Sequence, residues 1–289
     1  MHRYFLFGDF MISNVKIKSK SIIKGDTLRL FFISLFSFVV RRGAFALLIY
    51  CIVSLFKSGV LNFYFENYND AFVYSIVIFD VIFVSLTILL FISSLKLGEQ
   101  FLYFIKASGG KGRLGLLFHF FTFKRSFRAL CLYTKLTVLK IGWLLYFLFP
   151  CIVCYGIAYY LYSKGNLLPV VFYILIIGSS VLLSFCIFMW RIAFSRYNAA
   201  PYYVCLNADI TPEKAIKKSV FFTDGVLRES VFLESSFLGW FLSCIAIIPF
   251  VYVLPYFKIS KASFVVESLS LKAYPEAQNK YAINYLGLK

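Results

Sequence analysis

Five runs of apolar residues, separated by shorter polar and basic stretches, dominate the pattern along this chain. The runs lie at about residues 44–63, 71–95, 137–162, 167–190 and 235–254. Each approaches the roughly 20 residues that a helix needs to cross the hydrocarbon core of a bilayer. The pattern therefore predicts an all-α, polytopic transmembrane helix bundle of five or six spans, with amphipathic helices on its cytoplasmic face.

The boundary of the first span is the least regular part of this pattern. Leu28 to Val40 is apolar but too short to cross a bilayer alone, and Arg41 and Arg42 follow it. We expect residues 1–43 to form a cytoplasmic N-terminal segment that ends in an interfacial helix. The alternative is one long helix with the arginine pair near mid-bilayer, which would be costly.

Charge along the chain predicts its orientation. Lysine and arginine predominate in residues 1–29 and 96–128, whereas residues 64–70 carry acids and no base. Basic loops stay in the cytoplasm, so we expect a multi-pass protein of the plasma membrane with a cytoplasmic N-terminus. A single transmembrane domain would cover residues 44–257, including cytoplasmic loops at 96–128 and 191–234.

The C-terminal tail, residues 258–289, gives conflicting signals. Five crossings would place it outside, yet it carries five lysines and two glutamates, which favours the cytoplasm. A last run that is broken at Pro249 and turns back would resolve the conflict. We favour a single crossing, because long tails follow the charge rule poorly, and the broken run is the alternative.

Composition narrows the class of protein and of partner. Hydrophobic residues make up 61% of the chain and charged residues 15%, where a soluble domain carries roughly 25% charged residues. The net charge of +17 favours contact with anionic lipid headgroups. No nucleic-acid motif accompanies the positive charge, so we expect no nucleic-acid partner. A second membrane protein, or a second copy of this chain, would also fit.

Few residues carry candidate chemistry. Asp80 lies near the middle of the second expected span, where an acid either lines a path for protons or cations or is protonated and hydrogen-bonded to a neighbouring helix. Cys151 and Cys154 form a CxxC within the third span, but no histidine or second CxxC accompanies them. We expect no metal site, no cofactor and no catalytic set, and hence no enzyme.

A polar, basic helix precedes the last apolar run. Thr211, Pro212 and Glu213 form a helix start, with threonine as N-cap, proline in the first turn and an acid near the positive end of the helix dipole. We expect this helix to end at about Thr223. Its lysines, Lys214, Lys217 and Lys218, favour a position on the membrane surface or against the loop at 96–128.

The segments ADITPEKAIKKS and ESSFLGWFLSCIAIIPFVYVLPYF in this region resemble the C-terminal signature of a known family. It is a bacterial integral membrane family with a domain of unknown function, frequent in Gram-positive species. The resemblance implies a polytopic membrane protein and no particular activity. The signature positions, which we expect to be structural, are Glu213, Ser219, Ser236, Gly239, Trp240, Pro255 and Tyr256.

These observations favour a non-catalytic accessory or structural component of the membrane that contacts anionic lipid. The alternative is a small transporter or permease in which Asp80 lies in a polar path. A water-accessible cavity that reaches Asp80 would distinguish the two.

Overall fold

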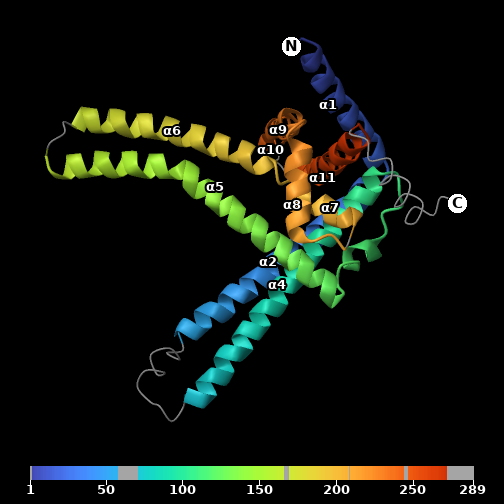
Figure 1. The fold of residues 1–289 in the computed structure, drawn as a ribbon, viewed down its shortest axis with the longest axis horizontal. Helices are drawn as coiled ribbons and strands as arrows, with labels where there is room; N and C mark the ends of the chain where they lie inside the picture. Colours follow the sequence, from blue (N-terminus) through green and yellow to red (C-terminus); the bar gives the residue numbers. More distant parts are fainter. Residues whose placement is uncertain (1, 58–70, 166–168, 208, 244–246, 272–289) are drawn as a thin grey trace.

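The computed structural model describes residues 2–57, 71–165, 169–207, 209–243 and 247–271. Within these ranges the chain is almost entirely helical and contains no strand, so the all-α fold class is confirmed. Two long helical hairpins extend from a body of shorter helices and point in diverging directions (Figure 1). We call the parts of the hairpins that extend beyond the body the arms.

The first hairpin consists of α2 (Thr27–Lys57) and α4 (Ala71–Ala107), and the second of α5 (Phe123–Ser163) and α6 (Pro169–Ser195). All four helices are long and apolar enough to cross a membrane. They are the only helices of this kind in the part of the chain that the structure describes, where five or six had been expected.

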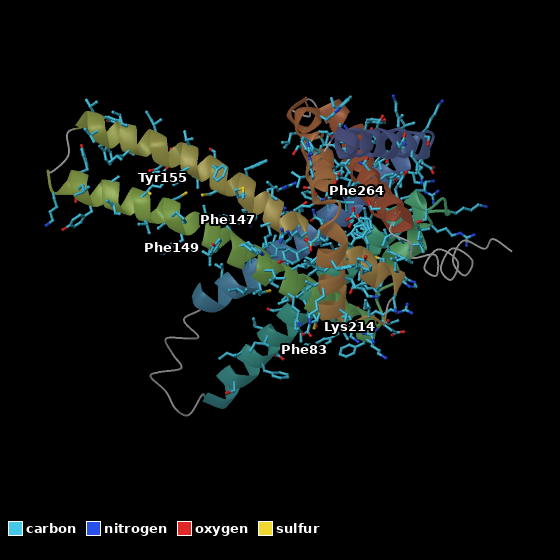
Figure 2. The ribbon with its side chains drawn as sticks, turned by 45° about the horizontal axis from the view of Figure 1, so that its top comes forward. Phe83, Phe147, Phe149, Tyr155, Lys214 and Phe264 are labelled. Atoms are coloured by element: carbon cyan, nitrogen blue, oxygen red, sulfur yellow. The ribbon has the colours of Figure 1, made fainter. Side chains whose placement is uncertain are left out.

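The arms present apolar side chains to their surroundings. Phe83 on α4 and Phe149 on α5 are both mostly exposed and project from the ribbon (Figure 2). The second arm carries no charged residue between Lys140 and Lys164, nor between Lys164 and Arg191. A helix from Lys140 to Lys164 rises by roughly 36 Å, which is enough to cross the roughly 30 Å apolar core of a bilayer.

The body collects the segments between and around the hairpins. Its helices are α1 (His2–Ile23), the 3-10 helix η2 (Leu114–Phe118), α7 (Ala200–Leu206), α8 (Pro212–Thr223), α9 (Leu227–Ser235), α10 (Leu238–Ser243) and α11 (Ile247–Leu271). α11 packs against α1 and against the body ends of α2 and α4. It is therefore the helix around which the body is built.

Small residues allow this close packing. Ser34 and Ser37 on α2, Ser94 on α4, and Ser260 and Ser263 on α11 are all fully buried. Small side chains let helix backbones approach closely, and serine can return its hydroxyl to a helix carbonyl. Ser94 does so with the carbonyl oxygen of Leu90, at 2.8 Å.

Two expected boundaries differ from the structure. α2 is continuous through Arg41 and Arg42, as in the long-helix alternative, and not an interfacial helix followed by a separate span. α11 continues through Pro255 to Leu271, and its Ile259 and Ala262 are fully buried. The tail that we expected from residue 258 therefore begins inside a core helix, and residues 272–289 lie outside the residues that the structure describes.

The basic helix of the body was predicted correctly. α8 begins at Pro212 and ends at Thr223, and the side chain of Thr211 accepts the backbone N–H of Lys214 at 3.5 Å. Ala215 and Ser219 are buried against the body, whereas the three lysines of α8 are exposed. One side of the helix therefore faces the body, and its lysines point outward.

Gly98 offers a test of how tightly α4 meets η2. A Cβ at this position would overlap the backbone carbonyl oxygen of Leu117 and lie 2.7 Å from its carbonyl carbon. Because backbone atoms must move, we expect Gly98→Ala to lower the free energy of unfolding by about 1–3 kcal/mol. Gly142→Ala is the control, since no atom lies within 4 Å of a Cβ there. Equal unfolding midpoints for the two variants in detergent would contradict the close contact.

Candidate functional site

The polar residues of the body converge on two buried carboxylates. Glu99 of α4 is only 4% exposed and lies between α2 and α11. Its Oε2 accepts Arg41 Nη2 at 2.8 Å and Ser37 Oγ at 3.0 Å, both from α2. Its Oε1 accepts Lys258 Nζ from α11. We call these four residues the Glu99 cluster.

The geometry follows from helix periodicity. Ser37 and Arg41 are four residues apart on α2, so their side chains share one face of that helix. This face is the same one that buries Ile33 and Ser34 nearer its start. A carboxylate at Glu99 therefore meets a hydroxyl and a guanidinium from one neighbour and an ammonium from another.

A second cluster also combines a glutamate with an arginine and a lysine. Glu234 of α9, 9% exposed, accepts Arg191 Nη2 of α6 at 2.8 Å and Asn198 Nδ2 at 2.8 Å. Lys261 of α11 lies 2.5 Å from its Oε1. Burial raises the pKa of Glu234, but the charges and hydrogen bonds of Lys261 and Arg191 outweigh it and hold the pKa below its ordinary value. We call these four residues the Glu234 cluster.

α11 joins the two clusters. Lys258 and Lys261 are three residues apart, so they lie on neighbouring positions of one helix face. One of them is bound at the base of the first hairpin through Glu99, and the other near the base of the second through Glu234 and Arg191. Each arginine belongs to a hairpin, each glutamate is buried, and both lysines belong to α11.

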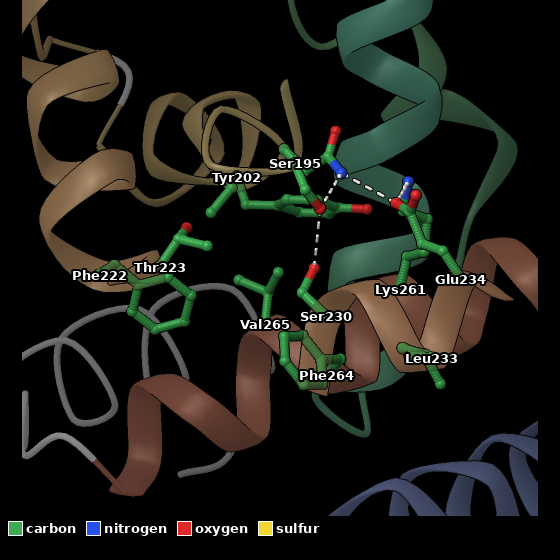
Figure 3. Close-up of a pocket in the computed structure, with 12 residues that line it drawn as sticks. Ser195, Tyr202, Phe222, Thr223, Ser230, Leu233, Glu234, Lys261, Phe264 and Val265 are labelled. Atoms are coloured by element: carbon green, nitrogen blue, oxygen red, sulfur yellow. Dashed lines mark hydrogen bonds and ion pairs between the residues drawn. The ribbon is translucent and has the colours of Figure 1, made fainter. Parts of the chain in front are cut away.

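A small cavity adjoins the Glu234 cluster. Its volume is about 20 Å³, and polar groups of Ser195, Asn198, Ser230, Glu234 and Lys261 line it together with apolar side chains (Figure 3). Ser195 Oγ and Ser230 Oγ are 3.4 Å apart across it. A cavity of this size and polarity has room for about one water molecule and not for an organic substrate.

A larger, open groove of about 520 Å³ lies between α6 and α9. Its lining is mixed, with Phe188 and Ile192 from α6, Phe232 from α9, and charged groups from the turn between α8 and α9 and the start of α9. Arg228 lies over the ring of Phe232 at 5.4 Å. Acids and a base alternate along it, so it favours no single charge.

Asp80 lies away from both cavities. It is exposed on α4, within the arm of the first hairpin, and neither cavity includes it in its lining. Asp80 lies nine residues after the start of α4 at Ala71, and this end of the helix is the one remote from the body (Figure 1).

The cysteine pair takes a different arrangement from its sequence motif. Cys151 is buried in the second hairpin and its Sγ lies 3.6 Å from that of Cys186 on α6, whereas Cys154 is exposed. The CxxC residues therefore point in different directions, as expected for cysteines that pack as small apolar residues. Among the residues described, no group of three histidine, cysteine or acidic side chains could hold a metal ion.

The signature positions make structural contacts. Ser219 Oγ donates to the carbonyl oxygen of Arg196 at 2.8 Å, and Ser236 Oγ to that of Leu233 at 2.7 Å. Glu213 is exposed and pairs with Lys135. The contacts of Ser219 and Glu213 fix α8 to its neighbours, whereas that of Ser236 caps the end of α9.

The remaining signature residues lie on α10 and α11. Gly239 and Trp240 are exposed on α10, while Pro255 and Tyr256 are buried within α11. The ring of Tyr256 meets that of Phe237 at a centroid distance of 5.0 Å. None of the signature residues belongs to either carboxylate cluster.

The two carboxylates themselves were not predicted as a site. Glu99 is the only acid in the basic stretch from 96 to 128, and Glu234 directly precedes the last apolar run. A single acid among apolar and basic residues is a signal for a buried ion pair, because a lone carboxylate would not be buried without one.

The chain matches no protein-family model, no curated protein and no solved structure. The resemblance to a Gram-positive membrane family therefore stays a prediction.

Removal of the Glu99 carboxylate should be strongly destabilising. Glu99→Ala leaves Arg41 and Lys258 partly buried without their counter-charge, and breaking a buried pair typically costs about 3–5 kcal/mol. The control is Glu213→Gln, which removes one exposed pair and should leave the midpoint of unfolding in detergent almost unchanged. Similar midpoints for the two variants would contradict the role given to Glu99.

The pH dependence of stability should report on Glu234. Because its pKa in the folded protein is depressed, its contribution is complete above the unfolded value, about 4.3, and is lost as the pH falls through the folded pKa. We expect the stability difference between wild type and Glu234→Gln to be constant from about pH 8 to 5 and to shrink below that. A difference that grows on acidification would contradict the assignment.

Proposed function

We propose that this chain is a non-catalytic, integral component of the plasma membrane. In this proposal the two hairpins cross the bilayer, and the body lies at the cytoplasmic headgroup layer and contacts anionic lipid. The observation that carries it is the division of the molecule into two outwardly apolar arms with few charged residues and one body that holds the basic segments.

The arms support the membrane part of the proposal. Phe83, Phe149 and Ile177 are each at least 60% exposed, and such surfaces in a soluble protein would cause aggregation. Basic and aromatic residues stand where the second arm meets the body. Trp190 Nε1 donates to the carbonyl oxygen of Lys140 at 3.0 Å, and Trp143 Nε1 to the hydroxyl of Tyr197 at 3.2 Å. Tryptophan with lysine is typical of the membrane interface.

The number of crossings bears on the position of the tail. Two hairpins make four crossings, which return the chain to its starting side and agree with a lysine-rich tail in the cytoplasm. In the five-span alternative, the run at 235–254 would cross as well. It is divided between α9, α10 and α11, and α11 is held in the body by Lys258 and Lys261. We therefore favour four crossings.

A structural role fits the charged groups of the body. The carboxylates of Glu99 and Glu234 are each engaged by two cations, so neither is poised as a general base or nucleophile. The 20 Å³ cavity beside Glu234 is too small for a substrate. We infer that these groups hold helices together and do not perform a reaction.

Topology tests this proposal directly. A green fluorescent protein fused after Lys289 should fluoresce, because it folds in the cytoplasm. An epitope inserted between Lys164 and Gly165, at the tip of the second hairpin, should be accessible to antibody on intact spheroplasts. A fusion protein that does not fluoresce would contradict the four-crossing arrangement. Extraction of the chain from membranes by alkaline carbonate would contradict membrane integration itself.

The transporter alternative depends on Asp80, whose exposure on an apolar arm is unusual for an acid. Proton flux into proteoliposomes, followed with a pH-sensitive dye, distinguishes the two functions. A flux that the Asp80→Asn variant loses would favour transport. Equal leak in wild type, variant and empty vesicles would favour the structural role.

A further inference from the structure

The connection from α4 to α5 is held against the first hairpin by one of its faces. Leu117 and Phe120 are each 1% exposed. The ring of Phe121 meets Phe91 of α4 at 5.4 Å, and His119 stacks on Phe101 at 4.9 Å. The segment is therefore fixed beside the part of α4 that runs from Phe91 to Phe101.

Other side chains of this segment are exposed, and they are of two kinds, apolar and basic. The apolar members are between 51% and 79% exposed, and the basic members are also exposed. We call this surface the basic–aromatic patch. Its members are Lys111, Arg113, Leu114, Phe118, Phe123, Lys124 and Phe127.

The patch lies where the first arm meets the body. Phe91 belongs to the apolar part of α4, and Glu99, only two residues before Phe101, belongs to the body. If the arms cross a bilayer, this level along α4 is that of the headgroups. Amphipathic segments that place aromatic and basic side chains together are typical of that layer.

Charge points to the chemistry of the partner. The sequence contains no acid from Gln100 to Ala208, so the patch and its flanks carry only positive charge. Outside this segment, Asp209 lies near Lys124 of the patch but forms its ion pair with Arg128 at 2.8 Å, and Asp26 binds Lys106. A second copy of the chain would bring the same positive charges to a two-fold interface, which is unfavourable.

We propose that the basic–aromatic patch is a docking surface for anionic phospholipid, a proposal that rests on the membrane embedding of the arms. The rings of Phe118 and Phe123 enter the upper acyl region, and Lys111, Arg113 and Lys124 contact lipid phosphates. This anchors the α4–α5 connection, and through Gly98 and Leu117 the body, to the headgroup layer.

Photo-crosslinking of the full chain tests this. p-Benzoylphenylalanine replaces Phe123, and the protein is reconstituted in nanodiscs of phosphatidylglycerol and phosphatidylcholine in equal amounts. After illumination, intact mass identifies the adduct. We expect lipid adducts, with phosphatidylglycerol in at least about fivefold excess over phosphatidylcholine, because each basic side chain near the surface favours anionic lipid.

Two charge variants establish the source of the selectivity. Lys111→Gln/Arg113→Gln/Lys124→Gln should bring the adduct ratio at position 123 close to one. Lys214→Gln/Lys217→Gln/Lys218→Gln removes the same number of exposed charges from α8 and should leave the excess unchanged. An equal loss of the excess in both variants would mean that net charge, and not the patch, selects the lipid.

A second probe position separates this proposal from membrane embedding. The same photoreactive residue in place of Phe149, on the second arm, should give lipid adducts without preference for a headgroup. Absence of lipid adducts at Phe149 would overturn the embedding of the arms. Adducts at Phe149, combined with a crosslinked dimer, another protein or no adduct at position 123, would overturn the docking surface alone.

Discussion

Two carboxylates that are shielded from solvent and matched by cations hold the helices of the body to one another. A charge in this position is tolerated only when its partners are present in good geometry, and removal of one partner leaves the others uncompensated. Glu99 and Glu234 each meet an arginine from a hairpin and a lysine from α11. The attachment of both hairpins to the body therefore depends on one helix and two short-range electrostatic clusters.

Local features of the fold could be predicted from the sequence because they depend on neighbouring residues. Apolar length specified the arms, and the order Thr211, Pro212, Glu213 specified the start of α8. The helix ends that we expected near Pro255 and Arg41 were predicted less well. The packed helix α11 tolerates Pro255 in its interior. The energetic cost of placing Arg41 within a long helix is offset by Glu99, whose carboxylate lies 2.8 Å away.

Long-range contacts could not be predicted, since no local pattern encodes them. Lys258 and Glu99 are 159 residues apart in sequence, and no sequence pattern near either residue indicates that the other is its partner. The prominent mid-span acid, Asp80, drew attention because of its apolar surroundings, yet the acids that form contacts in the body lie at the edges of apolar runs. An acid at the edge of one apolar run, with arginine or lysine at the edges of other runs, predicts a buried ionic cluster better than an acid within a run does.

The position of α11 in the chain has a consequence for biosynthesis. The helices that it contacts, α1, α2, α4, α9 and α10, leave the ribosome before it. Both hairpins are therefore synthesised while Glu99 and Glu234 still lack their lysines, and these contacts of the body are incomplete until α11 emerges. A chain interrupted before Lys258 would carry incompletely neutralised acids at the foot of each hairpin.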